Sequence, residues 1–228
     1  MCKLKSAIIL KDRIFLPDYD SHSEMLEELG IKDDYLHASK TFVRVELSPK
    51  NGDVFSDIDT WELNVDQDIV PDWFDANTYK PLMIEKVKAW AKDHIHIGVD
   101  GLKINVGQNH YIKDCKDVEV CDSATVNKVC GSATVNKVCG SATVNYVCDS
   151  ATVNKVCGSA TVNYVCGSAT VNYVCDSATV NSSPYLRWNK KDKVILCDNA
   201  TFKDCYEKII YQAGGWKLVK VKKEQNND

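Results

Sequence analysis

Residues 121–129 read CDSATVNKV, and this nonapeptide recurs in tandem as far as Asn181, giving seven copies of which the last is cut short. Before that truncation only two positions vary: the second is Asp or Gly, and the eighth is Lys or Tyr. Self-similarity at a fixed short period is typical of solenoid architectures. The array therefore decides the fold class of this chain.

Each nonapeptide has the composition of one strand followed by a turn. Valine and threonine favour strands, whereas Asn and the Asp/Gly-Ser pair favour turns. In the first copy Ala124 and Val126 alternate with Ser123, Thr125 and Asn127, so the two sets point to opposite faces. Small identical inward residues suit coils stacked on one another, and the sequence predicts a β-solenoid.

Two coil lengths are compatible with the array. Two nonapeptides would make an 18-residue, two-sided coil, and three would make a 27-residue, roughly triangular one. The 27-residue spacing of Asp122, Asp149 and Asp176 fits the second, but a duplicated DNA segment of that length explains it equally well. In a 27-residue coil these carboxylates would stack at about 4.8 Å and repel one another. We favour the 18-residue coil.

The cysteines recur every nine residues without a CxxC pair or a neighbouring histidine, which is not a zinc-site spacing. We expect reduced thiols that act as small buried apolar groups. A calcium-binding β-roll needs a GGxGxD motif, and the array contains no Gly-Gly pair. The sequence therefore predicts no cofactor and no metal.

The outward rows are the predicted binding surface, because they repeat with every coil. The Thr and Asn positions would form flat Thr-x-Asn arrays, and the Lys and Tyr positions would form another row. The predicted binding residues are Thr125, Thr134, Thr143, Thr152, Thr161, Thr170, Asn127, Asn136, Asn145, Tyr146, Tyr164 and Tyr173.

The flanking segments predict a mainly β protein with a small α+β N-terminal domain over residues 1–95. Residues 96–181 would form the solenoid, with lead-in coils before the seven repeats, and residues 182–228 a β cap. In the cap, Phe202 replaces the repeat valine and would plug the core, and a hairpin would turn near Gly214 and Gly215. In the N-terminal domain, Pro81 predicts the first turn of a helix ending near Asp93.

Several closely spaced acidic and histidine residues in the N-terminal domain suggest the hypothesis of a metal-dependent enzyme. Asp18, Asp20 and His22 are the best placed of them, because alternate residues on a strand share a face. The structural interpretation is stronger: Asp18 and Asp20 precede a helix, where carboxylates complement the helix dipole. No phosphate loop or nucleophile elbow is present, so we assign no catalytic residue.

The net charge, the lengths of the apolar runs and the first residues limit which partners and which cell compartment we expect. The net charge of −4 argues against a nucleic-acid partner, and no apolar run approaches the roughly 18 residues of a membrane span. The first ten residues do not resemble a secretory signal, so we expect a cytoplasmic protein without a membrane partner.

The chain also resembles a group of uncharacterised proteins of intestinal bacteria and their prophages. In that group a similar N-terminal domain precedes a SATVN-type nonapeptide array of variable length. The resemblance rests on SAIIL at 6–10, PDYD at 17–20, VDQDIVPDW at 65–73 and the SATVN repeats. It implies a mobile-element setting and no particular activity.

We therefore expect a non-enzymatic repeat protein, used for binding or as a self-assembly scaffold. Its partner would be a second copy of itself in a homo-oligomer, an unidentified macromolecule or a small ligand. One alternative is a phage-type accessory protein that sequesters a small host molecule. The other is a metal-dependent enzyme in the N-terminal domain.

Overall fold

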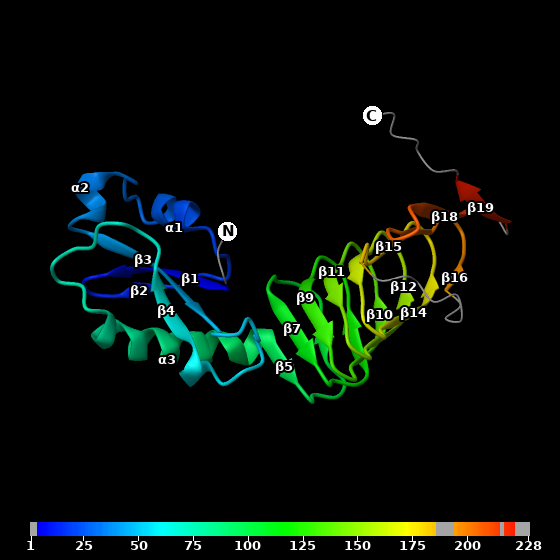
Figure 1. The fold of residues 1–228 in the computed structure, drawn as a ribbon, viewed down its shortest axis with the longest axis horizontal. Coiled ribbons are helices and arrows are strands. Elements are labelled where there is room, and N and C mark those ends of the chain that lie inside the picture. Colours follow the sequence, from blue (N-terminus) through cyan, green and yellow to red (C-terminus); the bar gives the residue numbers. More distant parts are fainter. Residues whose placement is uncertain (1–3, 186–193, 215–216, 222–228) are drawn as a thin grey trace. The chain divides into compact units, whose positions relative to one another are not determined.

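Small apolar and polar residues alternate along the chain after residue 96, and they make each nonapeptide one β-strand followed by a tight turn. The computed structural model describes residues 4–185, 194–214 and 217–221 (Figure 1). The chain divides into two compact units, Met1–Ile95 and His96–Asp228. The second unit contains both the solenoid and the cap that follows it.

The solenoid consists of two sheets whose strands alternate along the chain and are parallel as far as β16 and β17. One sheet has the order β16-β14-β12-β10-β8-β6, and the other has the order β19-β18-β17-β15-β13-β11-β9-β7-β5. The strands are β5 Ile95–Ile97, β6 Lys103–Ile104, β7 His110–Lys113, β8 Val118–Val120, β9 Thr125–Cys130, β10 Thr134–Val138, β11 Thr143–Val147, β12 Thr152–Val156, β13 Thr161–Val165, β14 Thr170–Val174, β15 Thr179–Ser182, β16 Ile195–Leu196, β17 Thr201–Asp204, β18 Ile209–Gly214 and β19 Lys217–Val221.

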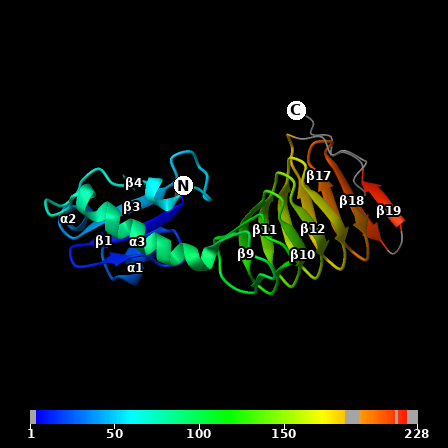
Figure 2. The same cartoon turned by 90° about the horizontal axis from the view of Figure 1, so that it is seen from below.

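The coil is 18 residues long, as we favoured. Thr134 pairs with Thr152 in one sheet, and Thr143 pairs with Thr161 in the other. Figure 2 shows the successive coils stacked along the solenoid. The inward positions are as the alternation predicts: Ala124, Val126 and Val129, like their equivalents, are buried in one continuous core. Adjacent strands are therefore held by backbone hydrogen bonds and by columns of identical side chains.

The variable Asp/Gly position is the second residue of a β-turn at each corner. In the third repeat Ala142 N–H donates to the Cys139 carbonyl at 3.2 Å, and Gly140 between them has a φ of 68°. Asp149 adopts the same left-handed region, with a φ of 59°. Only Gly, Asp and Asn enter this region readily, which explains why the position varies between Asp and Gly.

The lead-in and cap strands extend the two sheets at both ends. Of the alternating residues at 97–106, Ile104 points into the core, but Ile97 and Val106 are exposed. At the other end Phe202 pairs with Val180 and is buried in the core, as predicted for a plug. Strands β17, β18 and β19 are antiparallel, so the last parallel strand is covered by a hairpin. Gly215, Trp216 and the tail after Val221 lie outside the described residues.

The N-terminal unit is a four-stranded antiparallel sheet of order β2-β1-β3-β4 with helices packed on it. Every residue of the central strand β1 is buried, so both faces of that strand are covered. On one face Ile8 and Leu10 cluster with Met25 and Leu26 of helix α1. The elements are β1 Lys5–Leu10, β2 Ile14–Phe15, α1 His22–Glu28, α2 Tyr35–Ala38, β3 Phe42–Ser48, the 3-10 helix η1 Ile58–Thr60, β4 Glu62–Val65 and α3 Ala76–His94.

The long helix α3 begins earlier than Pro81 predicts. Asp75 caps it, because its carboxylate accepts hydrogen bonds from the backbone N–H groups of Asn77 and Thr78 at 3.2 and 3.1 Å. Pro81 consequently lies inside the helix, in the second turn rather than the first. The strong Asp cap at residue 75 fixes the start of the helix, and the proline is tolerated near its beginning.

Candidate binding face

The two-sheet coil divides the outward residues between two faces. We call the outward side of the nine-stranded sheet the tyrosine face and that of the six-stranded sheet the lysine face. Of the predicted binding residues, the tyrosine face carries Thr125, Thr143, Thr161, Asn127, Asn145, Tyr146 and Tyr164. The lysine face carries Thr134, Thr152, Thr170, Asn136 and Tyr173.

The single Lys/Tyr row of the sequence is therefore two rows in the structure. On the tyrosine face Lys128 pairs with both Tyr111 and Tyr146. On the lysine face Lys137 pairs with Glu119, and Lys155 pairs with Tyr173. Because consecutive repeats alternate between sheets, neighbours in the sequence become residues on opposite sides of the molecule.

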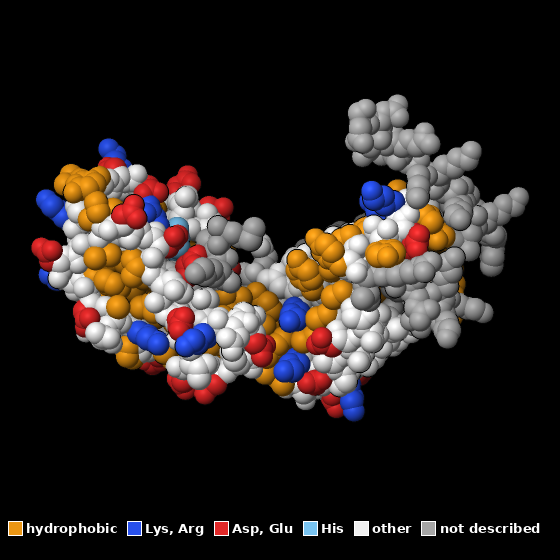
Figure 3. Space-filling model, viewed as in Figure 1, with side chains coloured by type: hydrophobic (Ala, Val, Ile, Leu, Met, Phe, Trp, Pro, Cys, Tyr) orange, Lys and Arg blue, Asp and Glu red, His pale blue; other side chains and the backbone are white. Residues whose placement is uncertain are grey.

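The tyrosine face combines aromatic rings with the cationic side chain of Lys128. Tyr146 is 52% exposed, and the rings of Tyr146 and Tyr164 lie 5.4 Å apart between centroids. Ser183 at the end of the array donates a hydrogen bond to the Tyr164 hydroxyl at 3.3 Å. Figure 3 shows hydrophobic side chains, in orange, gathered over β9 and β11 together with Lys or Arg in blue. The exposed Tyr146 and the half-buried Tyr164, in adjacent coils, form a stacking surface.

Asparagine side chains form a hydrogen-bonded ladder beside the aromatic row. Asn145 donates through Nδ2 to Asn127 Oδ1 at 2.9 Å, and Asn163 donates to Asn145 at the same distance. The lysine face has a matching ladder, in which Asn172 donates to Asn154 and Asn154 to Asn136. Each carboxamide has two N–H donors, and one of them is sufficient for the ladder.

The lead-in coil extends both rows of the tyrosine face, which sequence reasoning did not assign. Asn127 donates to Asn109 Oδ1 at 2.8 Å and to the Tyr111 hydroxyl at 3.0 Å. Asn109 lies 18 residues before Asn127. The 18-residue period, applied backwards from the first repeat, would have found it.

The cysteines form columns at the corners, but the burial that we expected holds within the array only for Cys130 and Cys157, because the other five array cysteines are half-buried. Burial raises the pKa of Cys130 to about 12 and that of Cys121 to about 11. All ten cysteines among the described residues are free thiols. The raised pKa keeps Cys130 and Cys121 in the weakly nucleophilic thiol form at neutral pH.

The three N-terminal residues with the best metal-binding pattern do not converge. Asp20 Oδ1 accepts from Lys5 Nζ at 2.9 Å, which stabilises a fully buried ammonium group. His22 lies between Asp66 Oδ2 and the Val45 carbonyl, each at 3.1 Å. Asp18 Oδ1 lies 3.8 Å from Nε2 of His94. Among the described residues of this unit, no three such side chains bring their ligand atoms together.

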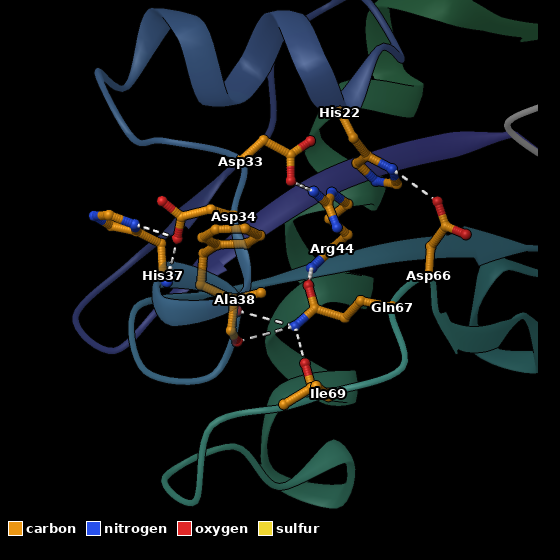
Figure 4. Close-up of polar contacts among 10 residues, drawn as sticks. His22, Asp33, Asp34, His37, Ala38, Arg44, Asp66, Gln67 and Ile69 are labelled. Atoms are coloured by element: carbon orange, nitrogen blue, oxygen red, sulfur yellow. Dashed lines mark hydrogen bonds and ion pairs between the residues drawn. The ribbon is translucent and has the colours of Figure 1, made fainter.

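A depression of about 580 Å³ in the N-terminal unit is lined by acidic residues and Arg44. Figure 4 shows that its polar groups are bonded to one another. Arg44 forms an ion pair with Asp33, and Gln67 bridges the Arg44 N–H at 2.8 Å and the Ile69 carbonyl at 2.6 Å. These contacts join β3 to the segment after β4.

Comparison with protein-family models, with curated proteins and with solved structures finds no match. Within the described residues, no helix has the length and apolar character needed to cross a membrane.

Proposed function

We propose that this protein is a non-catalytic repeat protein whose tyrosine face binds an extended polysaccharide. The observation that carries the proposal is the row of Tyr111, Lys128, Tyr146 and Tyr164 beside the asparagine ladder. A sugar ring offers an apolar face that stacks on an aromatic ring, and hydroxyls that pair with carboxamides. The tyrosine face supplies both kinds of contact in adjacent coils.

The repeat geometry favours a polymer over a small ligand. Strands of neighbouring coils lie about 4.8 Å apart, so the face offers an asparagine in each coil at a constant short interval, beside a row of tyrosines that Lys128 interrupts. Successive units of one chain then bind adjacent coils, and each contact raises the effective concentration for the next. The number of coils sets the length of the bound segment.

The tyrosine at the same repeat position on the opposite face provides a matched control. Tyr173 is 49% exposed, close to the 52% of Tyr146, but it lies on the lysine face beside Lys155. We expect Tyr146→Ala to weaken polysaccharide binding about threefold to tenfold, the loss of one aromatic contact, and Tyr173→Ala to leave it unchanged. Equal effects of the two substitutions would contradict the assignment of the face.

Affinity gel electrophoresis against soluble neutral and acidic polysaccharides measures this directly. Retardation of the wild-type protein by one of them, relieved by Tyr146→Ala, supports the proposal. No retardation by any of them rejects it. Sedimentation velocity on the same samples tests the second candidate, self-assembly, because a row of identical groups also fits a second copy of itself. A concentration-dependent oligomer that Tyr146→Ala dissociates would favour that candidate.

A further inference from the structure

Two corners of the solenoid each bring two cysteines and one aspartate together. The first cluster is Cys130, Cys148 and Asp149, and the second is Cys157, Cys175 and Asp176. In each cluster the two sulfur atoms and one carboxylate oxygen all lie within 4.8 Å of one another. The nine-residue spacing in the sequence hides these clusters, because the paired cysteines come from adjacent coils, 18 residues apart.

The corner turn builds the same geometry in both clusters. The lower coil contributes a Cys-Gly pair and the upper coil a Cys-Asp pair. Asp149 reaches back so that its Oδ2 accepts from Gly131 N–H at 3.0 Å, and Asp176 does the same with Gly158 at 2.8 Å. One oxygen of each carboxylate is thereby fixed, which orients the group toward the two cysteines of its corner.

The donor set is that of a zinc-type ion. Thiolates exclude calcium and magnesium as preferred ions, whereas Zn²⁺ accepts sulfur and carboxylate oxygen together. A Zn–S bond of about 2.3 Å places two sulfurs of a tetrahedral site about 3.8 Å apart, so two ligands within 4.8 Å need little adjustment. Three protein ligands leave the fourth position to water.

We propose that each of these two clusters binds one Zn²⁺ ion through two cysteine thiolates and one aspartate carboxylate. Binding displaces two thiol protons into solvent and involves no electron transfer. Cys130 and Cys157, at 2% and 6% exposure, form the inner side of the sites, and the exposed aspartates form the outer side from which the ion enters. Each ion would join two coils at a corner, and this inference does not depend on polysaccharide binding.

The remaining aspartate of the array, Asp122, is an internal control. Asp122 has the same left-handed backbone as Asp149 and Asp176, with a φ of 55°. The coil below it contains Ile104 and Asn105 at this corner, to whose carbonyl groups Cys121 and Ser123 donate. It has no cysteine there, and it belongs to neither cluster of described residues. Asp122→Asn should therefore leave metal binding unchanged.

The test is metal titration of the full chain in a non-thiol reductant. Native mass spectrometry counts bound Zn²⁺, and the thiolate-to-metal absorption of Cd²⁺, which takes the same ligands, reports sulfur coordination. We expect two equivalents for the wild-type protein and for Asp122→Asn, and one each for Asp149→Asn and Asp176→Asn. Asparagine tolerates the left-handed backbone and keeps an oxygen acceptor for the glycine N–H, so these variants retain the corner.

Three results would overturn the proposal. The first is the absence of bound zinc at micromolar concentrations of free ion. The second is a stoichiometry that neither Asp149→Asn nor Asp176→Asn lowers, which would mean that the cysteine columns bind metal without the carboxylates. The third is an equal loss in Asp122→Asn. Circular dichroism of every variant separates loss of a ligand from loss of the fold. A further variant, Cys148→Ser, removes a sulfur ligand instead of a carboxylate and should also leave one equivalent of bound zinc.

Discussion

Replacing Gly140 with alanine tests whether the corners of neighbouring coils are as closely stacked as the structure shows. A Cβ atom added at Gly140 would lie 2.8 Å from the Cα and N atoms of Asp122 in the coil below. The left-handed backbone, with a φ of 68°, costs alanine about 1–2 kcal/mol. Crowding against backbone atoms adds about 1–3 kcal/mol. We therefore expect Gly140→Ala to lower the free energy of unfolding by about 2–5 kcal/mol.

Gly98→Ala separates the two contributions. Gly98 has a similar φ of 63°, but an added Cβ there would meet nothing within 4 Å. That variant should lose only the backbone contribution, about 1–2 kcal/mol. Urea unfolding followed by far-ultraviolet circular dichroism gives both values by linear extrapolation. The difference between the two variants, about 1–3 kcal/mol, measures the stacking of the corners.

Equal losses for Gly140→Ala and Gly98→Ala would refute this reasoning, because they would show that the corners open without cost. Asp149 and Asp176 already carry a Cβ at equivalent corners, where their carboxylates bond to the glycine N–H below. Gly140→Asp should accordingly destabilise the protein less than Gly140→Ala. The reverse order would mean that this carboxylate contact does not offset the crowding.

Three further predictions concern the coil, the cap and the N-terminal unit. Deleting residues 149–166 should shorten the solenoid by one coil, whereas deleting residues 158–166 should move β17 to β19 into the sheet of β6 and β8, which crystal structures of both variants would distinguish. Phe202→Ala should cost about 3–5 kcal/mol in urea unfolding and Phe202→Val less, because valine restores the repeat; equal losses would argue against a plug. The hydrogen bond from the Tyr19 hydroxyl to Glu28 raises the pKa of Tyr19 to about 12 from an unfolded value of 10.0. Its stabilising contribution is therefore complete below pH 10 and is lost as the pH rises towards 12, so the wild-type protein should lose more stability over that range than Tyr19→Phe in pH-dependent unfolding.

The local pattern was sufficient for most of the solenoid and insufficient for the N-terminal unit. The inward Ala124 and Val126 and the Phe202 plug follow from alternation and repetition, whereas the strand register chose the 18-residue coil over the 27-residue coil that the array also allowed. Asp20 and His22 show the opposite case. Their partners, Lys5 and Asp66, lie on other segments of the sheet, and no spacing along the chain encodes those contacts.

The amino-acid sequence by itself determined that the repeats are strands, which of their side chains point inward, and where turns interrupt them. These properties depend on residue type and on period, and both are local. Only the tertiary structure decided which repeats share a face. Adjacent coils lie 18 residues apart, so Tyr146 joins Lys128 and Tyr164 while Tyr173 lies on the other side. The same stacking places Cys148 beside Cys130, a proximity created by hydrogen bonding between coils and not by the order of residues.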